Sequence, residues 1–183
     1  KFKEYALPTF FINGEEVKKS DLVRKKAMDN HFGGGVFALT YKNEKLTATA
    51  GGGANRYYGD HFGHVLWVKN YTGELQPNHE YYRNNGTKND ANIYLKAEYR
   101  PIECLNIYAD AQYRHIGYRI DGNNDKWNDA TDSHQQLAID EKFNFFNPKA
   151  GISYLPDSNN RLYASVGVAH KEPTRNNYTD GKL

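Results

Sequence analysis

The sequence predicts an all-β chain of about six antiparallel, up-and-down strands, on three observations. Its 183 residues include 15 Tyr, 9 Phe and 16 Gly but one Met and one Cys, and Tyr and Phe favour strands whereas Gly favours turns. Six segments alternate apolar and polar residues with a period of two, which is the period of a strand with two unlike faces. These segments fall into three hairpins, so neighbouring strands run in opposite directions.

Composition and charge exclude several classes of protein. No apolar run approaches the roughly 18 residues of a membrane-spanning helix. The formal net charge is +2, and no basic stretch is dense enough to indicate binding of nucleic acid. The single cysteine, Cys104, has no partner for an internal disulfide. The chain opens with Lys1 and without a signal-peptide pattern, so we expect an excised segment of a longer protein.

The central hairpin carries the clearest alternation. Its first strand covers residues 92–100 and its second residues 105–114, with Pro101 in the turn between them. The apolar face of the first strand consists of Ile93, Leu95, Ala97 and Tyr99, and that of the second of Leu105, Ile107, Ala109, Ala111 and Tyr113. The opposite face of both strands is polar or charged, so this hairpin has one apolar face and one polar, solvated face.

The same unit recurs on either side. The upstream hairpin pairs residues 37–41 with 46–50, and the downstream one pairs 148–154 with 162–169. The loops between hairpins are expected at about 52–90 and 118–142, far longer than the turns inside the hairpins. Because antiparallel neighbours alternate ends, all short turns lie at one end of the strands and all long loops at the other.

A tyrosine ends the apolar face of the first strand in each hairpin. These residues are Tyr41, Tyr99 and Tyr154, spaced 58 and 55 positions apart. An aromatic ring with a hydroxyl suits the boundary between hydrocarbon and water. The spacing predicts a level ring of aromatics, which become membrane-interface residues if the apolar face contacts lipid.

The apolar face consists largely of small side chains, which leaves two interpretations open. A soluble sandwich or lipocalin-like barrel would use this face as its core, filled with large side chains. A face that touches lipid needs only to be apolar. Much of this face is alanine: Ala48, Ala50, Ala97, Ala109, Ala111, Ala150 and Ala164.

Particular strings resemble the barrel of TonB-dependent outer-membrane receptors, especially those of the Bacteroidetes type. They are NHFGGGVFALTY at 30–41, GGGANRYYGDHFGHVLWV at 51–68, FNPKAGISY at 146–154 and RLYASVGVAHKEPTRNNYTD at 161–180. The resemblance covers most of the chain from Asp21 onward. It implies a 22-stranded transmembrane barrel in the outer membrane of a Gram-negative bacterium. Such a barrel is closed by a plug domain and imports a scarce ligand with energy relayed by inner-membrane TonB.

Six strands are about a quarter of such a barrel, so the resemblance implies a fragment of it. Residues 1–33 are then an extracellular loop segment with a short helix near 20–29. Residues 34–172 hold the three hairpins, and 173–183 begin a further extracellular loop. The implied partners are outer-membrane lipid, the receptor's own plug, TonB, and a small-molecule or glycan ligand of the iron chelate, haem, cobalamin or glycan class. The alternative is a secreted or periplasmic β-sandwich that binds glycans through loop aromatics.

One weak metal-site candidate lies in the first long loop. Asp60, His61 and His64 have side chains that bind zinc, copper or haem iron, and His79 follows in the same loop. His61 and His64 would meet on a helical turn but not on an extended strand. The Gly-rich surroundings favour an extended strand, and hence a structural role.

A second candidate is an acidic loop. Asp121, Asp125, Asp129 and Asp132 lie within twelve residues. The EF-hand pattern needs Gly at its sixth and Glu at its twelfth position, and this loop has Lys126 and Asp132 there. We therefore interpret it as a solvated loop rather than a calcium site.

Loop aromatics are the third candidate, as a ligand-contacting surface. They are Tyr57, Tyr58, Trp67, Tyr81, Tyr82 and Trp127, with Tyr71 in the same loop as several of them. Exposed Tyr and Trp stack on sugars and planar ligands, but packing within loops or at an outer headgroup belt is the favoured explanation.

Charged and polar residues on the polar face of the central hairpin are expected to line the lumen wall against the plug. They are Lys96, Glu98, Arg100, Asp110, Gln112 and Arg114, with opposite signs paired across the strands. No Ser/His/Asp set, phosphate loop or CxxC pattern is present, so we expect neither an enzyme nor a cofactor.

Overall fold

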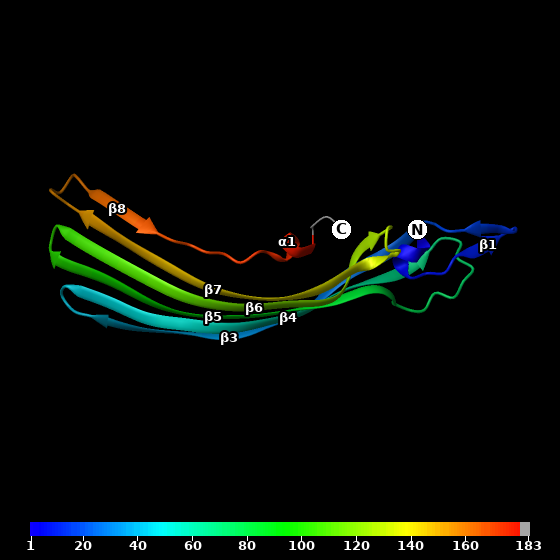
Figure 1. Ribbon diagram of the computed structural model, residues 1–183, viewed down its shortest axis with the longest axis horizontal. Helices are drawn as coiled ribbons and strands as arrows, with labels where there is room; N and C mark the ends of the chain where they lie inside the picture. The colour runs from blue at the N-terminus through cyan, green and yellow to red at the C-terminus, as the bar shows by residue number, and fades with distance from the viewer. Residues whose placement is uncertain (180–183) are drawn as a thin grey trace.

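The computed structural model describes residues 1–179 and consists mainly of one six-stranded antiparallel sheet (Figure 1). Its strands follow chain order: β3 (Leu22–Lys42), β4 (Leu46–Val68), β5 (His79–Ile102), β6 (Leu105–Asn128), β7 (Ser133–Tyr154) and β8 (Leu162–Gly167). The predicted six strands in three hairpins are therefore confirmed. A 3-10 helix, η1 (Phe2–Tyr5), and a small hairpin of β1 (Phe10–Ile12) and β2 (Glu15–Val17) precede the sheet, and α1 (Arg175–Thr179) follows it.

In the half of the sheet near the short turns, the register gathers the apolar residues of the strands on one face. One row across the ladder runs Leu39, Ala50, Leu95, Ala111 and Pro148. The next row, which points to the opposite face, runs Thr40, Thr49, Lys96, Asp110 and Lys149. Successive residues of a strand point to opposite faces, so in this part of the sheet a single register separates apolar from polar residues.

Strands β3 to β7 are 21 to 24 residues long, and this length corrects two expectations. The loops expected at 52–90 and 118–142 shrink to residues 69–78 and 129–132. The helix expected near 20–29 is wrong, because Leu22 begins β3 and these residues pair with β4. Outside the apolar segment, polar and apolar residues no longer alternate regularly along each strand, but the pairing of the main chains continues.

The three short turns lie at the same end of the sheet (Figure 1). In the β3–β4 turn, the Asn43 side-chain oxygen accepts hydrogen bonds from the backbone N–H groups of Lys45 and Leu46, at 2.9 and 2.8 Å. Asp157 accepts from the backbone N–H groups of Asn159 and Asn160 in the β7–β8 turn, both at 2.9 Å. Asn and Asp stabilise tight turns through such bonds.

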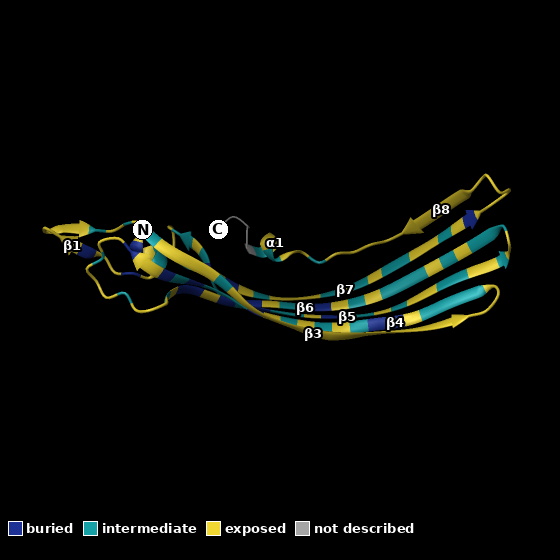
Figure 2. Ribbon diagram, turned by 180° about the vertical axis from the view of Figure 1, so that it is seen from behind, coloured by how far each residue is buried: buried dark blue, intermediate teal, exposed yellow. Residues whose placement is uncertain are grey.

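The opposite end of the sheet carries a small hydrophobic core around the N-terminus (Figure 2). It packs side chains of η1, of the link between η1 and β1, and of β1 against the ends of β4 and β5: Phe2, Leu7, Phe10, Val65, Val68, Tyr81 and Tyr82. The β1–β2 turn is Asn13-Gly14, with φ of 50° and 85°. An Asn-Gly pair between apolar residues is a strong hairpin signal, and the sequence analysis missed it.

The chain leaves the sheet after β8, which is exposed along its whole length (Figure 2). The last backbone hydrogen bond to β7 runs from the Val168 N–H to the Pro148 oxygen at 2.9 Å. Residues 168–179 then run over the side toward which the sheet curves (Figure 1). Of residues 173–183, the described part ends in α1, and residues 180–183 lie outside the described residues. No helix among the described residues is long and apolar enough to cross a membrane.

Candidate functional site

The polar face carries a cluster of four charged side chains where the C-terminal segment meets the sheet. The Arg114 guanidinium donates to both carboxylate oxygens of Asp90, at 2.9 and 2.5 Å. The Glu172 carboxylate accepts from Lys88 Nζ at 2.5 Å and from Arg114 at 3.2 Å. Asp90 and Glu172 are 9% and 15% exposed. The cluster thus pairs two cations with two partly desolvated anions, and such hydrogen bonds are stronger than neutral ones.

Glu172 brings the C-terminal segment into this cluster. Burial is the largest single effect and raises the pKa of the carboxyl, but the hydrogen bond from Lys88, a backbone hydrogen bond and the charges of Lys88 and Arg114 together hold that pKa below its ordinary value of 4.5. Glu172 is therefore a carboxylate at neutral pH, and it joins the segment to two strands of the sheet.

Further contacts hold residues 168–179, which we call the lumen segment, on the polar face. The His170 ring stacks on Phe145, with centroids 5.8 Å apart, and its backbone N–H donates to Asn147 at 2.8 Å. Arg175 donates to the Asn84 side-chain oxygen at 2.5 Å. Tyr178 lies 5.7 Å from Tyr118 between ring centroids. The lumen segment therefore crosses from β7 over β6 to β5.

The charges expected on the polar face are placed there by the register. Lys96 lies directly opposite Asp110, and Asp110 opposite Lys149 on β7. Glu98, Gln112 and Arg114 occupy the same face. Side chains of opposite charge on neighbouring strands stabilise a sheet and keep this face hydrated. Sequence analysis could not link Arg114 to Asp90 and Glu172. Asp90 is a diagonal neighbour on the next strand and Glu172 lies on a segment distant in sequence, and neither relation leaves a local pattern in the sequence.

The aromatic candidates do not converge on one site. Tyr81 and Tyr82 are 4% and 8% exposed in the N-terminal core, which contradicts their assignment as ligand contacts. Tyr57 donates its hydroxyl to Asn30 at 2.9 Å. The Trp127 ring packs edge-on to His134 with centroids 5.1 Å apart, and Lys3 lies over it.

Tyr58 and Trp67 are the two aromatic candidates that remain substantially exposed, at 38% and 51%. The Tyr58 hydroxyl donates to Asp60 at 3.0 Å. Trp67 lies at the far end of β4, opposite Val23.

The metal candidates are split by the strand. Asp60 and His64 have partners of their own, Arg83 at 3.1 Å and Glu80 at 3.5 Å. His61 is one position from Asp60 on an extended strand, so the two side chains point to opposite faces. Across residues 1–179 no group of three or more His, Cys, Asp or Glu side chains is arranged to hold a metal. The proposed Asp60, His61 and His64 site is therefore wrong, for the geometric reason that the strand separates its members.

The acidic residues near the second loop pair with lysines of the N-terminal part of the chain. Asp129 accepts from Lys1 at 3.2 Å, and that hydrogen bond holds the pKa of Asp129 below its ordinary value. Asp132 pairs with Lys3 and Asp125 with Lys26. These carboxylates join the end of β6 and the following turn to η1 and β3.

The three tyrosines of the expected interface ring lie on the apolar face, 59%, 45% and 43% exposed for Tyr41, Tyr99 and Tyr154. In the ladder each is shifted two positions toward the short turns relative to the one before. Tyr41 is level with Ala97, and Tyr99 is level with Ile152. Barrel strands tilt by about 35–45°. Neighbouring strands are about 4.8 Å apart and each residue rises about 3.3 Å along a strand. At this tilt, the residue that lies at a given membrane depth is displaced along the strand by roughly two positions for every two strands crossed.

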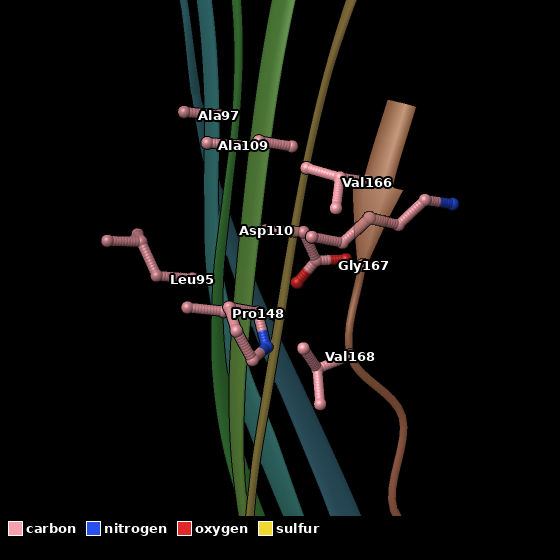
Figure 3. A pocket seen from close by; sticks show the side chains of 11 residues that line it. Leu95, Ala97, Ala109, Asp110, Pro148, Val166, Gly167 and Val168 are labelled. Atoms are coloured by element: carbon pink, nitrogen blue, oxygen red, sulfur yellow. The ribbon is translucent and has the colours of Figure 1, made fainter. Parts of the chain in front are cut away.

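A second aromatic pair, missed in the sequence analysis, bounds the apolar face on the other side. Tyr113 and Phe146 are cross-strand partners, 47% and 57% exposed. Beyond them on the same face come polar residues such as His115 and Asn144. Between the tyrosines and this pair lies a continuous apolar surface across the sheet, which we call the apolar band. Its middle is hollowed over β5 to β8 (Figure 3), where Ala97, Ala109 and Pro148 leave space between larger side chains.

An antiparallel sheet with one uncovered apolar band and one charged face has the arrangement of the wall of a transmembrane β-barrel. The chain belongs to the family described as TonB dependent receptor-like, beta-barrel, whose model matches residues 5–182. Among solved structures, it is similar to the ferric-catecholate import receptor Fiu of E. coli K12 in its open form, with a TM-score of 0.52 and 14% sequence identity. The match covers 81% of this chain and 26% of that receptor, and at this identity it concerns the fold alone. No curated protein matches the sequence.

Proposed function

We propose that this chain forms part of the wall of a TonB-dependent receptor that imports a scarce ligand across the outer membrane of a Gram-negative bacterium. The observation that carries the proposal is the apolar band, which is uncovered on one face of a sheet whose other face is charged. Members of the family are transporters, so the polar face has a structural and guiding role rather than a catalytic one.

The size of the apolar band fits an outer-membrane crossing. On β5 the band proper runs from Ile93, the ladder partner of Tyr113, to Tyr99. With Ala91, the next residue of the same face, the apolar stretch of this strand is about nine residues, and a transmembrane β-strand needs about 9–11. The rest of β5, from His79 to Asp90, extends beyond the band. In outer-membrane barrels the short turns are periplasmic and the long connections extracellular. The N-terminal core then lies on the extracellular side, well above the lipid.

The polar face is proposed to line the lumen and to contact the receptor's own plug domain, while TonB acts on the plug from the periplasm. The charged cluster and the lumen segment supply ion-pairing groups on this face just above the level of the band. Of the aromatic residues proposed to contact ligand, Tyr58 and Trp67 have exposed rings. We propose Tyr58 and Trp67 as ligand contacts through these exposed rings. Tyr57 and Trp127 are also proposed as ligand contacts, although their rings are partly covered.

The alternative, a secreted β-sandwich, requires a second sheet against the apolar face. Within the described residues no sheet covers it, and Ile93 and Leu95 are 64% and 58% exposed. The sandwich is therefore not the architecture of this chain, and glycans remain only as a class of imported ligand.

Uptake by cells tests the import proposal. Cells expressing the full-length receptor, with and without TonB, are given radiolabelled ferric catecholate, haem, cyanocobalamin or maltoheptaose. We expect uptake of one of these probes to require both the receptor and TonB. Uptake of all four that is unchanged by loss of the receptor would contradict import of these ligand classes.

A further inference from the structure

Two adjoining hollows lie on the apolar face of the sheet, at the edge of the apolar band, and extend across β3 to β6. The lower one, about 540 Å³, is walled by apolar and aromatic side chains that include Phe37, Ile93 and Tyr113. The upper one, about 380 Å³, includes Arg56 and Asn89 in its lining. The two share three lining residues, Ala54, Ala91 and His115, so they form one groove with an apolar and a polar end.

The sequence makes this groove by placing small residues in one row of the ladder. Gly35, Ala54, Ala91 and His115 are successive partners across four strands. A Cβ added at Gly35 would meet nothing within 4 Å, which shows that the row is open above the backbone. The rows on either side lie about 7 Å away along the strands, two residues at about 3.3 Å each.

The apolar end of the groove has fixed walls. Asn144 on β7 accepts hydrogen bonds from the Tyr113 hydroxyl at 2.9 Å and from His115 Nδ1 at 2.7 Å. One amide therefore orients both rings, with the Tyr113 hydroxyl at the polar side of its own ring. This is the arrangement expected where hydrocarbon gives way to headgroups.

The polar end carries a cation without a counterion. On the same face Arg83 pairs with Glu80 and Asp60, and Arg119 pairs with Asp121. Within residues 1–179 no carboxylate pairs with Arg56. Its ladder neighbours are Gly33 and Asn89, neither of which is charged, so the guanidinium is open to an anion from outside the chain.

We propose that this groove binds a membrane lipid with an anionic phosphate headgroup, one acyl chain lying against Phe37, Ile93 and Tyr113 and the phosphate on Arg56. The inference rests on the proposed membrane setting, because the groove lies where the outer leaflet would meet the barrel. Arginine suits this role because its planar fork matches phosphate geometry. The hollow in the middle of the band (Figure 3) is lined by Leu95, Val166 and Val168 on the apolar face. Its two charged lining residues, Asp110 and Lys149, are ladder partners in a row that points to the polar face, so neither charge lies on the face of the band.

Native mass spectrometry of the full-length receptor in detergent tests the site. The receptor is titrated with dimyristoyl phosphatidylglycerol, with dimyristoyl phosphatidylcholine of the same chains, and with inorganic phosphate. We expect phosphatidylglycerol to bind at least tenfold more tightly than phosphatidylcholine, and Arg56→Gln to remove that preference. Ala54→Phe should weaken both lipids by filling the floor of the groove.

Two matched variants serve as controls. Arg119→Gln removes a paired arginine from the same face, and Ala48→Phe adds the same bulk to the same face of β4 outside the groove. Both are expected to bind phosphatidylglycerol as the unaltered receptor does. Equal lipid binding by Arg56→Gln and the unaltered receptor, or full competition by inorganic phosphate alone, would overturn the inference. Ligand uptake and membrane insertion would still stand in that case, so this failure is distinct from failure of the proposed function.

Discussion

Replacing Leu95 with arginine is expected to destabilise the membrane-inserted barrel by about 2–4 kcal/mol, the cost of a basic side chain at the middle of a lipid-facing strand. Leu95 lies midway along the apolar band on β5, between Ala50 and Ala111, and is 58% exposed. In lipid the guanidinium has no counterion there. The measurement is urea unfolding of the full-length receptor in lipid vesicles, followed by the shift in gel mobility between folded and unfolded barrel.

Gln112→Arg is the matched control for this effect. Gln112 follows Ala111, the ladder partner of Leu95, so it lies at about the same depth and points to the polar face. The arginine placed there faces water and lies opposite Tyr94. We expect a change below about 1 kcal/mol. Equal destabilisation by the two variants would show that the apolar band does not face lipid.

Replacing Glu172 with glutamine is expected to release the lumen segment from the polar face. The variant loses charge-assisted hydrogen bonds to Lys88 and Arg114 in a partly buried setting, and such bonds contribute about 1.5–3 kcal/mol. Allowing for partial exposure, we expect the detached population to rise about tenfold. A nitroxide at the exposed Asn176 of the full-length receptor reports this as a growing mobile component in its spectrum.

Acid should act in the same direction as this substitution. The pKa of Glu172 is lowered in the folded state, so its stabilising contribution is present above the unfolded value of about 4.5 and is lost as the pH falls through the folded value. Glu98→Gln removes a carboxylate from the same face away from the lumen segment and should leave the nitroxide immobile. An unchanged spectrum in Glu172→Gln at neutral pH would refute the anchoring role of Glu172.

The six strands could be predicted because the apolar band imposes a period of two on each of them. The signal stops where the band stops, and for this reason the sequence analysis placed loops at 52–90 and 118–142 where β4 to β7 continue. Main-chain pairing needs no particular side chains. The N-terminal core was missed for a related reason: its members, such as Phe2 and Val65, are brought together by long-range packing that leaves no periodic pattern.

The polar face was predictable as a surface but not as a site. Alternation alone places Lys96, Asp110 and Arg114 on one face. The partners of Arg114 are a diagonal neighbour, Asp90, and a residue 58 positions away, Glu172, and neither relation is encoded locally. Residue types alone proposed Asp60, His61 and His64 as metal ligands, and the strand geometry separates them.

A nitroxide scan along β5 tests the central claim most directly, that one face of this sheet contacts lipid and the other contacts water. Single labels are placed at positions 91 to 99 of the full-length receptor in lipid bilayers, and collisions with oxygen and with a water-soluble nickel complex are measured. We predict oxygen accessibility peaking at Ile93, Leu95 and Ala97, and nickel accessibility peaking at Tyr94, Lys96 and Glu98. Accessibility without a period of two, or with the two reagents exchanged, would contradict the account.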